Sequence, residues 1–316
     1  MVFVTPLKSR KNWAIIRGQR TRCPSLQQQP ACKVDLSCII VNYKNSEPLK
    51  DCLASIYQTV KGINFEVIIV DNSENDPGLQ PLKELYPKAQ FISNSSNVGF
   101  SKANNQAAKI AQGNVLIFLN PDTILSNQAI NSMYKHVCSH TEIGALGPKV
   151  VNPDGSLQYS CRRYPTLWTG LFNRYSILSQ LFPENRFTSQ YLMRDFDHNE
   201  IWQVDWLSGC CLMVSKSIFE QSHGFDENYF LFNEDVDLCR TINKGGKRVI
   251  YFPEATVIHQ VSTSNSKTTA RVIIQRHLGM MHYFRKHDEG NFLTRGIINF
   301  FISLRGVTQL LINFIK

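Results

Sequence analysis

Polar side chains stand at the ends of three apolar runs in the first half of the chain. The runs LSCIIVN, EVIIVD and VLIFLN end in Asn42, Asp71 and Asn120, and Asp122 follows two residues later. Runs that are apolar on both faces predict central strands of a parallel sheet, and ligands bind at the carboxyl edge of such sheets. Asn and Asp are also ordinary turn residues, but the same chemistry at three strand ends favours a binding site. Asp122 is placed to bridge a divalent cation to a diphosphate, a task that needs an oxygen ligand.

A second group of acids lies further along, in the segment NEDVDLCR. Asn233, its first residue, is a favourable helix N-cap. Glu234, Asp235 and Asp237 are therefore expected in the first helical turn, where free N–H groups and the helix dipole favour ionised carboxylates. An ionised carboxylate directly behind the aromatic run YFLF is a candidate general base. Acids in a first turn are also ordinary helix design, and that alternative stays open.

Three further positions could serve such a site. Gly209, in the apolar segment WLSGCCLMV, allows close approach of another backbone segment. Trp206, at the start of that segment, offers an aromatic face on which a ligand could stack. His259 follows two more predicted strands and is either a metal ligand or a satisfied loop histidine.

The elements expected to hold these residues alternate between strands and helices. Helical patterns separate the runs at 36–42, 66–71 and 115–120, and one of them, the Ala-rich segment 102–111, stops near Gly113. The order β-α-β-α-β with short links predicts an α/β, doubly wound, mostly parallel sheet with helices on both faces. No G-x-G-x-x-G follows the first run and no G-x-x-x-x-G-K-[ST] occurs, which disfavours a nicotinamide-binding domain and a P-loop nucleotidase.

The positive charge is concentrated at the N-terminus. The net charge is +9, and residues 1–34 carry seven Lys and Arg side chains and no acid, so this segment is expected to be a basic, flexible extension. The remaining chain has little excess charge, so no nucleic-acid partner is expected. Nine cysteines without a C-x-x-C predict the reduced thiols of a cytoplasmic protein.

Seven short motifs carry most of these residues. They are IIVNYKN (39–45), VIIVDNS (67–73), NVGFSKANN (97–105), FLNPDT (118–123), WLSGCCLMV (206–214), GFDENYFLFNEDVDLCR (224–240) and VIHQ (257–260). Together they resemble the family 2 glycosyltransferases, and most closely the bacterial rhamnosyltransferase-like enzymes of cell-surface polysaccharide synthesis. The resemblance covers about residues 36–285. It implies a GT-A fold, an inverting mechanism, a nucleotide-diphospho-sugar donor, and Mg²⁺ or Mn²⁺ as cofactor.

The resemblance also implies roles for residues of the donor site. Asp71 matches the acid that holds the base of the donor nucleotide. Asn97, Gly99 and Asn105 match the loop that shapes the nucleotide pocket. Asn42, at the end of the first strand, is expected to complete this donor-binding set.

The metal and acceptor sites follow in the same way. The family's metal motif, D-x-D, reads Asn120-Pro121-Asp122 here, and His259 matches a histidine that is a second metal ligand in some members. Asp235 matches the catalytic base, with Glu234 as its neighbour. The residues expected to bind the acceptor are Trp206, Gly209 and Asp237.

The predicted organisation has three parts. Residues 1–34 form the extension, 35–265 the GT-A catalytic domain, and 266–316 a C-terminal helical segment that could associate with a membrane. Within the domain, 35–125 is the donor half and 126–265 the acceptor half. The expected function is transfer of a sugar, with rhamnose as the candidate, to a hydroxyl of a glycan or lipid-linked glycan.

Two other classes of protein fit these motifs less well. A sugar-phosphate nucleotidyltransferase would need a glycine-rich loop with a basic residue after the first strand, and 41–49 has none. A non-catalytic carbohydrate-binding protein would be favoured by a degenerate base or metal position, yet Asp122 and Asp235 are both present. The expected location is cytoplasmic, with peripheral attachment to the inner face of the membrane.

Overall fold

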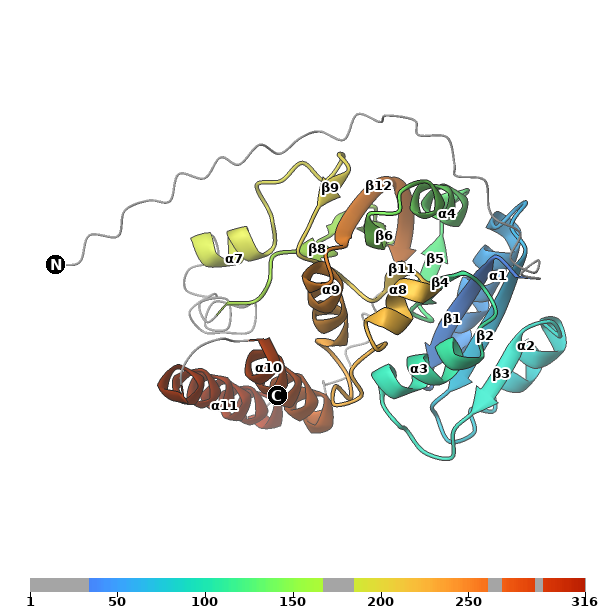
Figure 1. Ribbon diagram of the computed structural model, residues 1–316. Helices are drawn as coiled ribbons and strands as arrows, with labels where there is room; N and C mark the ends of the chain where they lie inside the picture. Colours follow the sequence, from blue (N-terminus) through green and yellow to red (C-terminus); the bar gives the residue numbers. More distant parts are fainter. Residues whose placement is uncertain (1–33, 167–184, 261–268, 288–291, 316) are drawn as a thin grey trace. The chain divides into compact units, whose positions relative to one another are not determined.

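The computed structural model describes residues 34–166, 185–260, 269–287 and 292–315 (Figure 1). These residues belong to one compact unit, Cys32–Lys316. At the centre of the described part lies a ten-stranded sheet, and the main path through it runs β3-β2-β1-β4-β11-β6-β12-β5.

One half of the sheet is parallel. Its strands are β1 (Leu36–Asn42), β2 (Phe65–Asp71), β3 (Gln90–Ser93) and β4 (Val115–Leu119). Strands β1, β2 and β4 coincide with the three apolar runs of the sequence because β1, β4 and most of β2 are buried, whereas β3 is a partly exposed strand outside those runs. The register places Asn42 beside Asp71, and Asp71 beside Ser93, so these polar strand ends share one edge.

The other half of the sheet is mixed. Its strands are β5 (Thr123–Leu125), β6 (Ile143–Val151), β7 (Leu157–Gln158), β9 (Trp202–Gln203), β11 (Cys211–Ser215) and β12 (Arg248–His259). Strand β11 runs antiparallel to β4 and β6, whereas β12 runs parallel to β6. A separate two-stranded sheet pairs β8 (Cys161–Arg162) with β10 (Trp206–Leu207).

Helices cover both faces of the large sheet. One face carries α1 (Ser46–Thr59), α2 (Leu79–Leu85) and α4 (Ala129–Ser139); the other carries α3 (Phe100–Ile110), α8 (Lys216–Gln221) and α9 (Glu234–Lys244). A short helix, α7 (Arg186–Tyr191), lies near the small sheet. The predicted α/β sheet with helices on both faces is confirmed, and β5, β7, β9 and β11 pair antiparallel with their neighbours in it.

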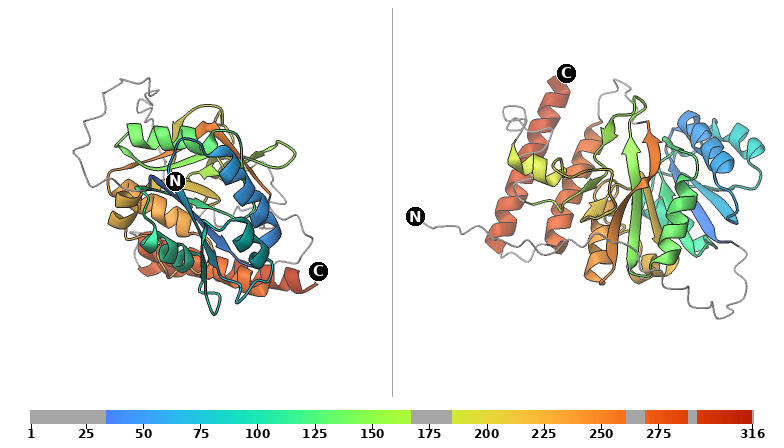
Figure 2. Two further views of the ribbon diagram at one scale, coloured as in Figure 1. Left: turned by 90° about the vertical axis from the view of Figure 1, so that its right-hand side faces the viewer. Right: turned by 90° about the horizontal axis from the view of Figure 1, so that it is seen from above.

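Two long helices form the C-terminal part. Helix α10 (Ala270–His287) and helix α11 (Phe292–Ile315) pack side by side, on the side of α9 that faces away from the sheet (Figures 1 and 2). Ile273 and Tyr283 of α10 and Ile298 and Ile302 of α11 are buried and join the core on this side. Helices α10 and α11 are therefore packed against the rest of the protein core rather than separate from it.

Candidate active site

The carboxyl edge of the parallel strands carries a connected set of polar side chains. Asp71 is almost fully buried; its Oδ1 accepts a hydrogen bond from Ser73 N–H at 2.9 Å, and its Oδ2 accepts one from Asp76 N–H at 3.3 Å. Asn42, on the neighbouring strand, donates from Nδ2 to Asp76 Oδ2 at 3.2 Å. The structure thus brings Asn42 and Asp71, both predicted to bind the donor, to the two sides of Asp76.

Asn72 organises the adjoining loop, although the sequence did not single it out for the site. Its Nδ2 donates to Asn97 Oδ1 at 2.9 Å and to Gly99 O at 3.2 Å, and its Oδ1 accepts from Val98 N–H at 3.2 Å. Asn97 Oδ1 also accepts from Gly99 N–H at 3.0 Å. The loop that carries Asn97 and Gly99 is therefore fixed from the end of β2. The signal in the sequence is the position of Asn72 directly after Asp71.

The same loop meets the aromatic loop, residues 225–232, which leads into α9. Gly99 has a φ of +93°, and a Cβ there would lie 2.8 Å from Phe230 O, so only glycine fits this approach. Asn105 binds both backbone groups of Phe225: its Oδ1 accepts from the N–H at 3.0 Å and its Nδ2 donates to the C=O at 2.8 Å. Asn105 therefore ties α3 to the aromatic loop, and its contact with the donor stays a prediction.

Asp122 and His259 face each other beyond the end of β4. His259, the last residue of β12, pairs with Thr123 of β5. Its Nε2 lies 3.2 Å from Asp122 Oδ1 and 3.3 Å from Asn120 Nδ2. Three residues predicted for the donor and metal sites are thus in contact.

Gln158 fixes the orientation of the His259 ring. Gln158 Nε2 donates to Asn152 Oδ1 at 2.6 Å and to the His259 carbonyl at 2.7 Å, so its Oε1 is the acceptor that lies 3.0 Å from His259 Nδ1. The hydrogen-bond network therefore assigns the proton of the neutral ring to Nδ1 and leaves the Nε2 lone pair facing Asp122. This is the arrangement in which a second residue orients a metal-binding histidine.

A divalent cation fits this set of donors. Asp122 Oδ1 is buried without a hydrogen-bond donor, and the His259 Nε2 lone pair faces it. A carboxylate oxygen suits Mg²⁺ and Mn²⁺, and imidazole is accepted by transition metals. Among the described residues no group of three or more His, Cys, Asp and Glu side chains is arranged to hold a metal. A cation on Asp122 and His259 would therefore need oxygen atoms from substrate and water, which is how Mg²⁺ is commonly bound.

Asp235 lies at the start of α9 with both carboxylate oxygens oriented by the backbone. Oδ2 accepts from Gly209 N–H at 2.9 Å and Oδ1 accepts from Val236 N–H at 2.9 Å. Burial raises the pKa of Asp235, and the hydrogen bonds from Gly209 and Val236 and the charge of Arg162 offset only part of this rise. A raised pKa makes the carboxylate a stronger proton acceptor.

Glu234, its neighbour, has different surroundings. It is 6% exposed, and its Oε2 is buried without a hydrogen-bond partner. Burial, and next the charge of Asp235, raise the pKa of Glu234 well above its usual value. Glu234 therefore favours its neutral form, and the charge of the pair resides on Asp235.

A short backbone segment joins the metal end of the site to Asp235. Gly209 donates its N–H to Asp235, and the carbonyl of the next residue, Cys210, accepts from Asn120 N–H at 2.9 Å. Burial raises the pKa of the Cys210 thiol to about 11, and the charges of Asp122 and Asp235 both contribute to the rise. The predicted metal ligand and the predicted base thus flank the same two residues.

The sequence profile of Glycosyl transferase family 2 matches residues 37–223, which is more than half of the chain. The chain belongs to this family. Two relatives have been assigned to rhamnose transfer. The N-acetylglucosaminyl-diphospho-decaprenol L-rhamnosyltransferase of Mycobacterium tuberculosis is 30% identical over 253 residues, which cover 77% of this chain and 81% of the relative. The rhamnosyltransferase WbbL of Escherichia coli is 26% identical over 236 residues, which cover 72% and 84%.

Solved structures show the same fold at low sequence identity. GalNAc-T7, crystallised with UDP, GalNAc and Mn²⁺, superposes with a TM-score of 0.58 at 14% identity and covers 88% of this chain, which spans 57% of that chain. The mannosyltransferase PcManGT from Pyrobaculum calidifontis, crystallised with GDP-Man and Mn²⁺, gives 0.57 at 14% identity, with 86% of this chain and 74% of that one covered. The protein is therefore a rhamnosyltransferase-like family 2 glycosyltransferase with the GT-A fold, as the motifs predict.

Two residues that the sequence assigns to the acceptor of this glycosyltransferase make internal contacts. Trp206 is 5% exposed, its Nε1 donates to Arg163 O at 2.8 Å, and the Arg162 guanidinium lies 5.0 Å from its ring centroid. Asp237 is 2% exposed and faces α10. Gly209 is the predicted acceptor residue that lies against the base. Acceptor contacts of all three residues stay predictions.

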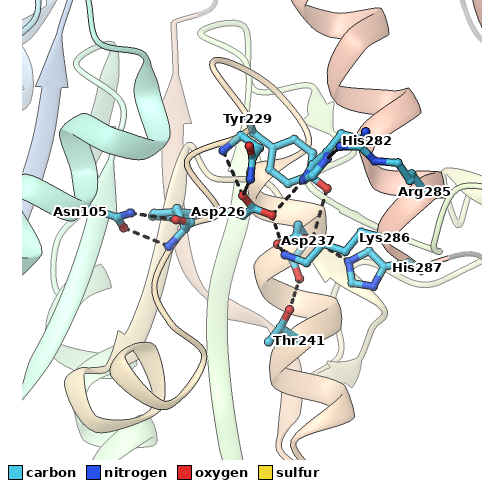
Figure 3. A network of polar contacts seen from close by, with 11 residues as sticks. Asn105, Asp226, Tyr229, Asp237, Thr241, His282, Arg285, Lys286 and His287 are labelled. Carbon is cyan, nitrogen blue, oxygen red and sulfur yellow. Dashed lines mark hydrogen bonds and ion pairs between the residues drawn. The ribbon is translucent and has the colours of Figure 1, made fainter.

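A network of charged groups ties α9 and the aromatic loop to α10 (Figure 3). Asp237 Oδ1 lies 2.6 Å from His287 Nε2, and its Oδ2 accepts from Lys286 Nζ at 2.9 Å. Lys286 Nζ also donates to Asp226 Oδ2 at 2.8 Å, and His282 Nε2 lies 3.0 Å from the same oxygen. Burial alone would raise the pKa of Asp226, but the hydrogen bonds from His282 and Lys286 hold it well below its usual range. The basic run HYFRKH is the sequence signal for this network, but only the fold shows which acids it meets.

Proposed function

We propose that this glycosyltransferase moves rhamnose, with inversion, from a nucleoside diphospho-rhamnose to a hydroxyl of a lipid-linked glycan in cell-surface polysaccharide synthesis. The observation that carries the proposal is the placement of Asp122 and Asp235 around Gly209 and Cys210. In a direct displacement, the leaving diphosphate and the attacking hydroxyl lie on opposite sides of the anomeric carbon. Because Asp122 and Asp235 flank one short backbone segment, a sugar bound there would have its leaving diphosphate near Asp122 and the attacking hydroxyl near Asp235.

The donor end has the groups that this reaction needs. Asp71 and Asn42 would hold the base of the nucleotide, and the loop with Asn97 and Gly99 would shape its pocket. Asp122 and His259 would hold Mg²⁺ or Mn²⁺, which supplies positive charge against the charge that develops on the leaving diphosphate. The buried, unsatisfied Asp122 Oδ1 supports this assignment.

At the other end, Asp235 acts as the general base. Gly209 N–H and Val236 N–H hold its carboxylate in place, and its raised pKa strengthens it as a proton acceptor. Asp235 takes the proton of the acceptor hydroxyl, whose oxygen forms the new bond to the anomeric carbon while the bond to the donor diphosphate breaks. The neutral Glu234 leaves the negative charge on Asp235.

The apolar, exposed face of helix α11 supports the proposal that the acceptor is bound to a membrane. Among the described residues, the segment Leu293–Phe314 is long and apolar enough to cross a membrane by length and composition. Its exposed large side chains recur at alternating spacings of three and four residues: Leu293, Ile297, Phe300, Leu304, Val307, Leu311 and Phe314. The opposite face, with Ile298 and Ile302, is buried in the protein. We therefore propose that the helix lies in the membrane interface rather than across the bilayer.

We propose one role for each of three parts of the chain. Residues 35–125 supply the donor half, 126–265 the acceptor half with the base, and 266–316 the attachment to the cytoplasmic face of the membrane. Residues 1–33 of the extension 1–34 lie outside the described residues, and its seven basic side chains would add attraction to anionic lipid.

The test is donor-dependent release of nucleoside diphosphate. Purified protein is given a panel of nucleotide sugars and a short lipid-linked acceptor, with Mg²⁺ or Mn²⁺ or with excess EDTA. The proposal expects release and sugar transfer with a rhamnose donor, and loss of both in EDTA. Transfer from a different sugar would overturn the donor assignment, and full activity in EDTA would overturn the metal site.

A further inference from the structure

A cavity of about 700 Å³ lies between α7, β9 and the segment that follows β8. Figures 1 and 2 show α7 on the side of the molecule away from β1 and β2, whose ends carry Asn42 and Asp71. Among the described residues that line the cavity, none is assigned above to the donor, the metal ion or the base. Its volume is within the range of small-molecule sites, roughly 300–1,000 Å³. The cavity therefore offers room for a ligand that the donor site does not hold.

Aromatic side chains form part of the cavity wall. Phe196 and Trp202 lie side by side, with ring centroids 5.4 Å apart and ring planes at 42°. Tyr164, Phe187 and Tyr191 also line the space. Aromatic rings provide flat, rigid and apolar faces. A sugar ring has apolar C–H groups on its face and hydroxyls around its edge, so its face suits such a wall.

The wall is fixed by contacts with the surrounding elements. Tyr164 N–H donates to Asp205 Oδ2 at 2.8 Å, and the Tyr164 hydroxyl accepts from Asn243 Nδ2 of α9 at 2.6 Å. Arg163 N–H donates to Tyr191 O at 3.0 Å, which joins the segment after β8 to α7. A ligand that enters a preformed site loses less free energy to the ordering of protein side chains. The cavity wall therefore has the preorganisation of a binding site.

The charge of the cavity lining is negative. Asp195, Asp197 and Glu200 line the cavity and are exposed. Among the described lining residues, the single cationic side chain is Arg163, whose Nη1 lies 3.5 Å from Asp205 Oδ1. The negative charge repels a diphosphate or an anionic lipid headgroup, whereas carboxylate oxygens accept strong hydrogen bonds from hydroxyl groups. The lining therefore favours a neutral ligand that carries hydroxyls.

A series of contacts joins the cavity to the base. The ring centroid of Tyr191, in the cavity wall, lies 6.4 Å from that of Trp206, and Trp206 Nε1 donates to Arg163 O at 2.8 Å. Trp206 precedes Gly209 by three residues, and Gly209 N–H donates to Asp235 Oδ2 at 2.9 Å. The cavity therefore adjoins the elements that hold the base, on the acceptor side of the reaction.

We propose that this cavity is a subsite for the second sugar of the acceptor, counted from the sugar that receives rhamnose. The proposal rests on the proposed function and narrows its acceptor to a neutral glycan with at least two sugars before the lipid diphosphate. The aromatic wall holds the face of the second sugar, and Asp195 and Glu200 accept hydrogen bonds from its hydroxyls. An acceptor with a single sugar would bring its diphosphate to the acidic lining, which repels it.

Calorimetry on the full chain, with nucleoside diphosphate and Mg²⁺ in the donor site, tests the subsite. The probes are three neutral disaccharides (chitobiose, cellobiose and rhamnosyl-rhamnose) and the basic peptide trilysine. At least one disaccharide should bind. The double variant Asp195→Asn with Glu200→Gln should weaken its binding about tenfold or more, because amide oxygens are weaker acceptors than carboxylate oxygens. Failure of all three disaccharides to bind, or binding of trilysine in their place, would overturn the proposal.

Controls separate the role of the cavity from folding. Glu254→Gln removes an exposed carboxylate of β12 outside the cavity, and this variant should bind the disaccharide like the wild type. Trp202→Ala should abolish measurable binding, and Trp202→Phe should restore part of it, because phenylalanine returns an aromatic face. Unchanged binding in the double variant and in Trp202→Ala would assign the disaccharide to another place and overturn the subsite.

Kinetics distinguish failure of the subsite from failure of the proposed function. Two lipid-linked acceptors end in the same sugar, the one that accepts rhamnose in the transfer assay, and differ by one further sugar before the diphosphate. The wild type should prefer the two-sugar acceptor about tenfold in kcat/KM, and the double variant should lose this preference with its donor KM unchanged. Equal wild-type values for the two acceptors would overturn the subsite and leave the proposed function standing. Disaccharide binding that depends on Asp195 and Glu200, without any transfer of rhamnose, would overturn the proposed function and leave the binding site standing.

Discussion

Asp235 and Glu234 are neighbours in the sequence, yet replacement of each acid by its amide should have different effects. Asp235→Asn removes the proton acceptor while keeping an oxygen for Gly209 N–H, so kcat should fall by about 10²-fold or more with nucleotide affinity retained. Glu234→Gln resembles the neutral form that burial favours, so its effect should be mild. Turnover numbers and thermal shifts with nucleoside diphosphate measure the two effects. Normal transfer by Asp235→Asn would show that another group is the base.

Asp122 should show a different phenotype, because it acts on the donor. Asp122→Ala removes the carboxylate that faces His259 Nε2, so the affinity for nucleotide in the presence of Mn²⁺ should fall. In EDTA the variant and the wild type should bind nucleotide alike. Calorimetry with and without Mn²⁺ measures this difference. An unchanged Mn²⁺ dependence in the variant would rule out Asp122 as a ligand.

From the sequence, the polar residues at the ends of predicted strands were easier to locate than the residues that orient them. Asn42, Asp71 and Asp122 follow apolar runs and can be located by that pattern alone. Asn72 directly follows the same run as Asp71, but its contact with Asn97 cannot be predicted, and Gln158 has no such position, because both roles arise from contacts that are formed by the fold. A polar residue that orients another one carries no periodic signal of its own.

At the scale of elements, α10 holds α9 and the aromatic loop together through Asp226 and Asp237. Asp226→Asn should lower the free energy of unfolding by about 1–3 kcal/mol at pH 7, because Lys286 and His282 lose their charged acceptor. The folded-state pKa of Asp226 lies below its unfolded value of about 3.9, so this stability is present above that pH and is lost as the pH falls through the folded pKa.

Urea unfolding between pH 7 and pH 2 measures the effect of Asp226→Asn. The difference from the wild type should shrink on acidification below about pH 4. Asp51→Asn, at an exposed position on α1, is the control and should unfold like the wild type at every pH. A difference that stays constant down to pH 2 would show that the network does not depend on the Asp226 charge.

Elements in both halves of the chain were predictable, including the helix that begins at Glu234, but the pairing of the later strands was not, for a physical reason. Strand β1 was predicted at 36–42 and lies there, because a strand buried on both faces is apolar throughout. Strand β11 lies antiparallel between β4 and β6, which are distant from it in the sequence. An apolar run has the same pattern whether the strand runs parallel or antiparallel to its neighbours, so the sequence does not predict the direction of β11. The packing of α10 on α9 depends on ion pairs between segments about 50 residues apart.

At the scale of the whole molecule, the exposed stripe of α11 needs a partner. Its spacing of three and four residues would also fit a second copy of the chain. The charge favours a membrane, because residues 292–315 contain two arginines and no acid. A helix with one buried face and one apolar exposed face suits the surface of an anionic bilayer.

Vesicle flotation with the full chain decides between these partners. The wild type should float with vesicles that contain anionic lipid, and the double variant Phe300→Ser with Leu304→Ser should stay in the soluble fraction, because it removes the centre of the stripe. Leu85→Ser, which removes an exposed apolar side chain from α2, should float like the wild type. Light scattering on the same proteins measures their mass without lipid. A wild type that is dimeric and does not float, together with a monomeric double variant, would assign the stripe to a second copy and leave the membrane attachment without support.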